Sequence, residues 1–204
     1  MTARSVADAR AFLAATPKDR IAVAWTLFLT RGLRRGEMCG LRWDAVDLEG
    51  GVIKILSTRV VVDGEAITSA PKTNAGKRSI PLDPSLVTLL RSHRTKQAAE
   101  KLKAGEAYLD GGYVLADELG QPYHPDTVSD TFERLVNAAK LPKIRLHDTR
   151  HTAASLMLAS GVQTKIVSEL LGHSSPTITL SIYAHVMPRM AEDAGAALSA
   201  SLLG

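Results

Sequence analysis

Three short stretches of this sequence combine arginine and histidine in ways that suit a phosphate ligand. The first, TRGLRRGE at residues 30–37, is a glycine-containing turn with three arginines. The second is LHDTRH at residues 146–151. The third is LGHSSP at residues 171–176, which is followed by IYAH at residues 182–185. A guanidinium presents a planar two-donor fork to phosphate oxygens, and an imidazole adds a further donor.

The second stretch contains a histidine and an arginine that could act on one ligand. His147 and Arg150 are three residues apart, so on a helix they lie on the same face. A different interpretation gives them structural roles, in which Arg150 pairs with a carboxylate and His147 caps the helix. The pair taken alone leaves both interpretations open.

A zinc site is the main alternative from another class of chemistry. His147 and His151 are four residues apart, Asp148 stands where an HExxH site has its glutamate, and His173 could be a third ligand. The shorter aspartate would retract the catalytic base, and a zinc site leaves the arginines and the tyrosine unexplained. We therefore expect no metal.

The composition is that of a globular protein with one sizeable domain. The chain has 204 residues, of which 45% are hydrophobic and 23% charged. Its net charge of +4 is compatible with a nucleic-acid partner but is weak evidence by itself. No apolar run approaches the ~20 residues that cross a bilayer, and no signal peptide is recognisable, so we expect a cytoplasmic protein with no membrane contact. The single cysteine, Cys39, has apolar neighbours and is expected to be buried.

Hydrophobic periodicity predicts an α+β chain that is mainly helical. Helices are expected at residues 5–15, 18–30, 35–41, 84–104, 125–139, 147–160, 163–171, 176–185 and 188–203. The β-branched runs 52–56 and 59–62 and the segment 78–81 are expected to form one three-stranded antiparallel sheet, with a turn at Asp63-Gly64. The arginine turn then precedes a helix, the HxxR stretch starts one, and Gly172 ends the helix before His173.

Four stretches in this order resemble the phage-integrase, or tyrosine recombinase, family. They are TRGLRRGEMCGLRWDAVDL, PKTNAGKRSIPLD, LHDTRHTAASLMLASG and LLGHSSPTITLSIYAHV. Each motif is modestly specific, whereas four in order, the last closed by a tyrosine, are highly specific. The resemblance covers about residues 26–186 and implies the catalytic fold of a site-specific DNA recombinase that works in a bacterial or phage-infected host cell.

The resemblance also implies an active site. Two arginines and two histidines would bind the scissile phosphate, a lysine would protonate the leaving 5′-oxygen, and a tyrosine would form a 3′-phosphotyrosine link without metal, cofactor or ATP. The matching residues are Arg34, Arg150, His147, His173, Lys72 and Tyr183, with Glu37 as a bracing carboxylate. Lys77 and Arg78, beside Lys72, are candidates for contacts with DNA backbone phosphates.

The sequence departs from the family pattern in two places. His173 and Tyr183 are 183 − 173 = 10 residues apart, one more than is commonest in the family. The family's usual N-terminal DNA-clamping domain is expected to be absent from this chain, which we divide into a catalytic domain at 1–187 and a tail helix at 188–204. The tail is expected either to dock on a neighbouring subunit, in a tetramer on double-stranded DNA, or to pack on its own domain.

Two other functions fit parts of the same motifs. A type IB topoisomerase would share the chemistry, although the wording of the motifs favours recombination. A non-catalytic DNA-binding module with a decayed site is disfavoured, because such a site should have lost some of the six matching residues.

Overall fold

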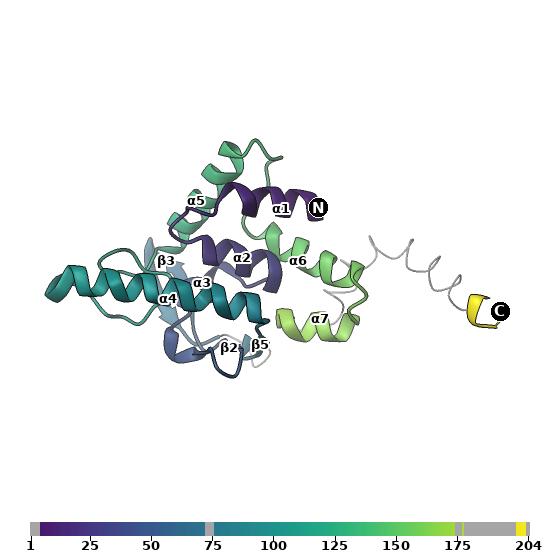
Figure 1. Ribbon diagram of the computed structural model, residues 1–204, viewed down its shortest axis with the longest axis horizontal. Helices are drawn as coiled ribbons and strands as arrows, with labels where there is room; N and C mark the ends of the chain where they lie inside the picture. The colour runs from purple at the N-terminus through teal and green to yellow at the C-terminus, as the bar shows by residue number, and fades with distance from the viewer. Residues whose placement is uncertain (1–4, 72–75, 174–176, 178–198, 203–204) are drawn as a thin grey trace.

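The computed structural model describes residues 5–71, 76–173, 177 and 199–202, and it confirms a mainly helical chain with small antiparallel sheets (Figure 1). The helices are α1 (Val6–Ala15), α2 (Ala22–Arg31), α3 (Arg35–Gly40), α4 (Pro84–Ala104), α5 (Pro125–Ala138), α6 (Asp148–Ala159) and α7 (Thr164–Leu171). The strands are β1 (Val46–Asp47), β2 (Val52–Lys54), β3 (Thr58–Val62), β4 (Glu65–Ser69) and β5 (Ser79–Pro81). Short 3-10 turns occur at η1 (Trp43–Ala45) and η3 (Gly105–Ala107).

The strands pair differently from the single three-stranded sheet that we predicted. One antiparallel sheet has the order β1-β2-β5, and β3 forms a separate hairpin with β4. The turn residues Asp63 and Gly64 both have positive φ, 50° and 84°, as a tight two-residue hairpin requires. Strand β4 escaped prediction because it is mostly exposed and so lacks the apolar alternation that marks a half-buried strand.

Helix α2 is the central helix of the core. Trp25, Leu27 and Phe28 are almost fully buried, as is typical of a helix surrounded by protein on all sides. Phe12 of α1 and Phe132 of α5 lie against Trp25, with ring centroids 6.2 and 5.8 Å from its own. Figure 1 shows α2 between α1 and α4, and it also packs on α6. The first and last thirds of the chain are thereby held on one helix.

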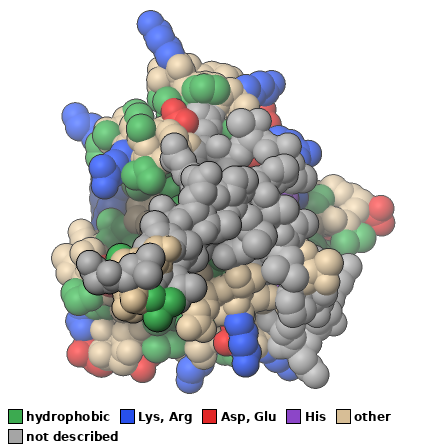
Figure 2. Space-filling model, turned by 90° about the vertical axis from the view of Figure 1, so that its right-hand side faces the viewer, with side chains coloured by type: hydrophobic (Ala, Val, Ile, Leu, Met, Phe, Trp, Pro, Cys, Tyr) green, Lys and Arg blue, Asp and Glu red, His purple; other side chains and the backbone are tan. Residues whose placement is uncertain are grey.

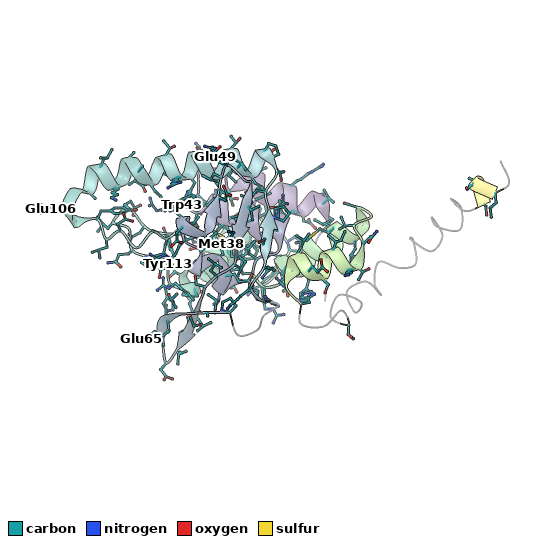
Figure 3. All side chains as sticks on the ribbon, turned by 90° about the horizontal axis from the view of Figure 1, so that it is seen from below. Met38, Trp43, Glu49, Glu65, Glu106 and Tyr113 are labelled. Carbon is teal, nitrogen blue, oxygen red and sulfur yellow. The ribbon has the colours of Figure 1, made fainter. Side chains whose placement is uncertain are left out.

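The β3–β4 hairpin projects from this core, with Glu65 at its tip (Figure 3). An arginine–tyrosine stack anchors its base. The guanidinium carbons of Arg42 and Arg59 lie 5.4 and 5.5 Å from the centroid of the Tyr113 ring, and the Tyr113 hydroxyl is 3.2 Å from Thr68 Oγ1. These contacts fix the hairpin to the loop after η3.

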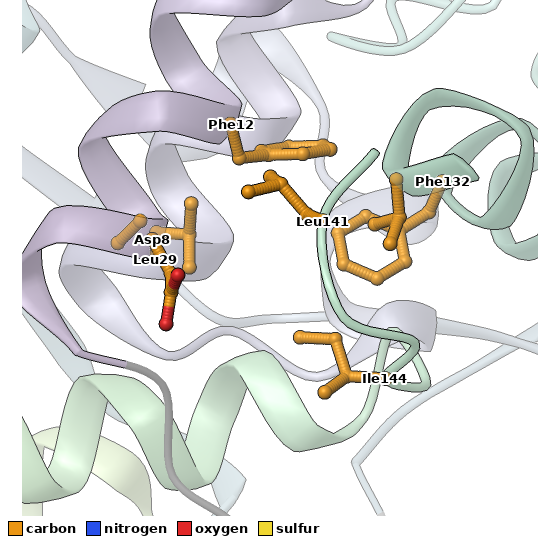
Figure 4. A pocket seen from close by; sticks show the side chains of 8 residues that line it. Asp8, Phe12, Leu29, Phe132, Leu141 and Ile144 are labelled. Atoms are coloured by element: carbon orange, nitrogen blue, oxygen red, sulfur yellow. The ribbon is translucent and has the colours of Figure 1, made fainter. Parts of the chain in front are cut away.

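An apolar hollow lies between α1, α5 and the end of α2 (Figure 4). Its walls include Phe12, Leu29, Phe132, Leu141 and Ile144, with Asp8 alongside. None of the predicted catalytic or DNA-binding residues lines this hollow, so it is distinct from the candidate site.

The structure bears on the cysteine and on possible membrane-spanning helices. Cys39 is buried, as predicted, and burial raises the pKa of its thiol to about 12. Among the helices in the described part of the chain, none combines the length and apolar character needed to cross a membrane.

Gly32 lies where the end of α2 meets α6 and α7, two residues before Arg34. It ends α2 in the left-handed conformation, with φ +62°, and its missing side chain leaves room for Leu171 of α7 and Ala153 of α6. Any Cβ at this position would overlap the Leu171 side chain. The ends of α2 and α7 therefore approach each other closely because residue 32 is glycine.

We predict that Gly32→Ala destabilises the protein more than Gly161→Ala does. Both glycines have positive φ, so alanine costs about 1–2 kcal/mol of backbone strain at either position. Gly161 faces open space, whereas Gly32 adds the overlap with Leu171. Urea unfolding of the two variants measures the difference, and equal losses would show that the contact between α2 and α7 is not tight.

Candidate active site

The fold brings together four of the residues that the sequence predicted. Arg34 is the N-cap of α3, His147 and Arg150 lie at the start of α6, and His173 follows the C-cap of α7. Besides burial, which is the largest cause, the charges of Arg34 and Arg150 lower the pKa of His173 and the charge of Arg150 lowers that of His147, so these side chains are near one another. Residues separated by more than a hundred positions therefore form one cluster, on the α6–α7 side of the molecule. Figure 2 views that side, with described Lys and Arg side chains around its edge.

Three arginines hold three successive carbonyls at the end of α7. Arg78 Nε donates to the Leu170 carbonyl at 2.6 Å, Arg150 Nη2 donates to the Leu171 carbonyl, and Arg34 Nη2 donates to the Gly172 carbonyl at 2.8 Å. The last carbonyls of a helix lack partners within the helix and carry its negative dipole end, so cations stabilise them. This arrangement sets the position of His173 relative to the arginines.

Glu37 binds two of these arginines from a buried position. Its Oε1 accepts from Arg34 Nη1 at 2.7 Å and from Arg78 Nη1 at 2.8 Å. Its Oε2 accepts from Arg78 Nη2 at 2.9 Å and from the Arg34 backbone N–H at 2.8 Å. Burial alone would raise the pKa of Glu37, but the bonds from Arg78 and Arg34 lower it to about 2. The predicted bracing carboxylate is thus a charged group that orients both arginines.

The hydrogen bonds distinguish the arginines that can still bind a ligand. A guanidinium has five N–H groups. Hydrogen bonds within the described part of the chain use four of the N–H groups on Arg78. They use two N–H groups on the Arg34 guanidinium and two on that of Arg150. Arg34 and Arg150 therefore keep donors for a further acceptor.

Arg78 differs in this respect from what we predicted for it. Its side chain is 7% exposed and its guanidinium is directed at Glu37 and Leu170, so it is not placed to contact a DNA backbone phosphate. The sequence missed this role because an arginine next to a lysine on a strand is usually solvated. Lys77 is exposed, as a contact residue for DNA would need to be.

The structural interpretation of the HxxR pair finds no support in this geometry. Arg150 bonds to the carbonyls of Gly32 and Leu171 rather than to a carboxylate, and the His147 side chain makes no capping hydrogen bond to α6. His151 is only partly buried and meets His147 edge-on, with ring centroids 5.4 Å apart.

Within the ranges that the structure describes, no group of three or more His, Cys, Asp or Glu side chains is arranged to hold a metal ion.

The cluster has an excess of positive charge. Burial lowers the pKa of Arg150 to about 9, and Arg34 contributes to that decrease, so Arg150 stays charged at neutral pH. Burial and the same arginines lower the pKa of His173 to about 4, and burial and His151 lower that of His147. Both histidines are therefore neutral near pH 7, and an anion would relieve the repulsion between the arginines.

Two predicted catalytic residues, Lys72 and Tyr183, lie outside the described residues. The same holds for most of the tail at 188–204, of which residues 199–202 are described.

The low pKa of Glu37 predicts an acid-sensitive contribution to stability. A carboxyl whose pKa falls from 4.5 to about 2 on folding stabilises the protein by about 3 kcal/mol above pH 4.5. That contribution is lost as the pH falls toward 2. Urea unfolding of the wild type and Glu37→Gln from pH 7 to pH 2 should show the wild type losing more stability. Parallel curves would contradict the assigned charge.

Comparisons with known proteins place the chain among relatives of one family. The chain is 36% identical to the "Tyrosine recombinase XerC-like" protein of Caldanaerobacter subterraneus subsp. tengcongensis, over 86% of this chain and 48% of that protein. It is 29% identical to the ICEBs1 integrase of Bacillus subtilis, over 87% of this chain and 48% of that protein. The chain thus spans about half the length of these curated relatives.

Solved structures show the same fold. The Tn1549 transposon integrase in complex with transposon right end DNA matches with a TM-score of 0.81 and 25% identity, over 100% of this chain and 66% of that chain. The XerA recombinase shares the fold with a TM-score of 0.71 and 22% identity, over 90% of this chain and 58% of that chain. The profile of the phage integrase family matches residues 6–190. Because this match covers most of the sequence, the chain belongs to the phage integrase family.

Proposed function

We propose that this chain is the catalytic domain of a site-specific tyrosine recombinase. It breaks and rejoins strands of double-stranded DNA through a 3′-phosphotyrosine intermediate, without ATP, metal or cofactor. The observation that carries the proposal is the meeting of Arg34 and Arg150, which have donors to spare, with the neutral His147 and His173. The Tn1549 relative, which matches the whole chain, is described in complex with DNA.

The two arginines suit the scissile phosphate. A phosphodiester resists nucleophilic attack because its negative charge repels the nucleophile, and that charge concentrates on the oxygens in the transition state. Arg34 and Arg150 are already held by backbone carbonyls, so they would neutralise the charge without reorganising. Preorganised donors of this kind contribute roughly 10²–10³ each to rate.

Tyr183 and Lys72 supply the remaining chemistry in this proposal. The Tyr183 hydroxyl passes its proton to the neutral histidines of the cluster, and its oxygen bonds to phosphorus and displaces the 5′-oxygen, which takes a proton from Lys72. The phosphotyrosine link keeps the energy of the broken bond, and attack by a 5′-hydroxyl reverses the step. His147 and His173, neutral and adjacent to the arginines, would add hydrogen bonds and a route for protons.

The proposal extends to the partners of the domain. Lys77 is exposed beside Lys72 and would contact the DNA backbone. We propose that subunits assemble into a tetramer on DNA in the cytoplasm, with the tail at 188–204 docked on a neighbour. Leu202, which is 73% exposed, would contribute an apolar contact to such docking.

A nicked suicide substrate with the cognate site tests the mechanism. The wild type should accumulate a covalent 3′-linked protein–DNA adduct, and Tyr183→Phe should form none, because it lacks the nucleophilic oxygen. Tyr113→Phe is the matched control, since it keeps the stack between Arg42 and Arg59 and loses one hydroxyl contact. Denaturing gel electrophoresis detects the adduct. An adduct that persists in Tyr183→Phe would refute the assigned nucleophile.

Truncation after Pro188 tests the role of the tail. The shortened chain should still form the covalent adduct on a single site, while synapsis of two sites should fall sharply. Gel-shift analysis of synaptic complexes, run beside the adduct assay, separates the two activities. Equal loss of both would indicate that the tail packs on its own domain.

A further inference from the structure

Glu37 places a negative charge inside a site whose proposed task is to bind a negative phosphate. Its carboxylate is 5% exposed and contacts Arg34, one of the two phosphate-binding arginines of the proposed function. If Arg34 alone neutralised Glu37, its charge would not be available to DNA. The site therefore needs a second cation for Glu37.

We propose that Arg78 is that cation, and that it acts as a positioning residue which neutralises Glu37 and so keeps Arg34 available for the scissile phosphate. The inference rests on the proposed function. It gives Arg78 a role in the reaction through Glu37 and Arg34, without contact to the substrate.

Arg78 binds Glu37 more extensively than the Arg34 side chain does. Arg78 binds Glu37 with a two-point fork, at 2.8 and 2.9 Å, whereas the Arg34 side chain makes one bond to it, at 2.7 Å. The Arg78 and Glu37 side chains are 7% and 5% exposed, but that of Arg34 is 39% exposed. The buried ion pair is thus Arg78–Glu37, and Arg34 is the member that faces outward.

Arg78 is also held so that it cannot leave Glu37. Its Nε donates to the Leu170 carbonyl at 2.6 Å, and Nη1 lies 3.4 Å from the Gly76 carbonyl. A buried charge pair is stable only when its remaining hydrogen-bonding groups are satisfied, and these two bonds meet that need.

Arg78 raises the net positive charge of the cluster. Arg34, Arg78 and Arg150 contribute three positive charges and Glu37 one negative charge, which leaves 3 − 1 = +2. Without Arg78 the count is 2 − 1 = +1, and Glu37 has Arg34 as its partner in the described network. Removing Arg78 and the Glu37 charge together restores +2, which makes the double variant the decisive one.

The experiment measures the rate of adduct formation at saturating suicide substrate for Arg78→Met, Glu37→Gln and the double variant. Arg78→Met should cleave roughly 10²-fold more slowly than the wild type, because one transition-state charge contact is withdrawn. The double variant should cleave roughly tenfold or more faster than Arg78→Met, since the two residues are coupled. A residue with a merely structural role would lower the fraction of folded protein and leave the cleavage rate per folded molecule unchanged.

Arg20 provides a matched control elsewhere in the fold. It forms the same kind of fork, with both bonds to Glu100 at 2.7 Å, and its Nε donates to the Ala116 carbonyl at 3.2 Å. Arg20→Met should lower stability in the same way as Arg78→Met. Cleavage per folded molecule should stay at the wild-type rate.

The outcomes separate this inference from the proposed function. If the wild type forms no adduct, the proposed function fails. If the wild type forms the adduct and folded Arg78→Met cleaves equally fast, or the double variant is no faster than Arg78→Met, the function stands and the role of Arg78 is refuted.

Two variants keep the test decisive if Arg78→Met does not fold. The double variant replaces a buried ion pair by neutral side chains, a change that proteins often tolerate, and it should cleave within roughly tenfold of the wild-type rate. Arg78→Lys keeps the charge without the fork and should retain most of the activity. Either of these variants, if folded but inactive, would overturn the proposal.

Discussion

The candidate site depends on the buried carboxylate of Glu37. Four hydrogen bonds, three from guanidinium groups and one from a backbone N–H, hold it in place and lower its pKa to about 2. Removing both arginines would leave a buried charge unpaired, which is expensive in a protein interior. The positions of Arg34 and Arg78 are therefore fixed by one acidic side chain.

The arginines in turn connect this carboxylate to α7. Successive carbonyls at its C-terminus accept from Arg78, Arg150 and Arg34, so the start of α3, the start of α6 and the end of α7 form one unit. Gly32 allows the close approach of these elements. The unit keeps more positive than negative charge, an arrangement that lowers stability in the free protein and favours an anion in the bound state.

Local sequence signals were enough to predict most helices, and the resemblance to the family indicated the arginines and histidines that the fold brings into one cluster. Helix α4, for example, starts at Pro84 after the capping residue Asp83, and α7 ends at Gly172 in the left-handed conformation. Local sequence patterns did not predict correctly which strands pair. The run at residues 59–62 has high β-propensity, but its partner β4 is largely exposed, and pairing depends on contacts that a local pattern does not encode.

The sequence by itself determined the chemical inventory of this protein, because residue types and their order along the chain carry the family motifs whatever their spatial arrangement. Only the tertiary structure decided what each arginine does. Arg34, Arg78 and Arg150 have the same side chain, and they differ in the acceptors that distant segments bring to them. Arg78 uses three of its five N–H groups on Glu37 and the end of α7 and a fourth on the Gly76 carbonyl. Bonds among the described residues use only two N–H groups on Arg34 and two on Arg150. Burial and hydrogen bonding are long-range properties, and they separate an arginine whose N–H groups are mostly used within the protein from those that keep donors for a ligand.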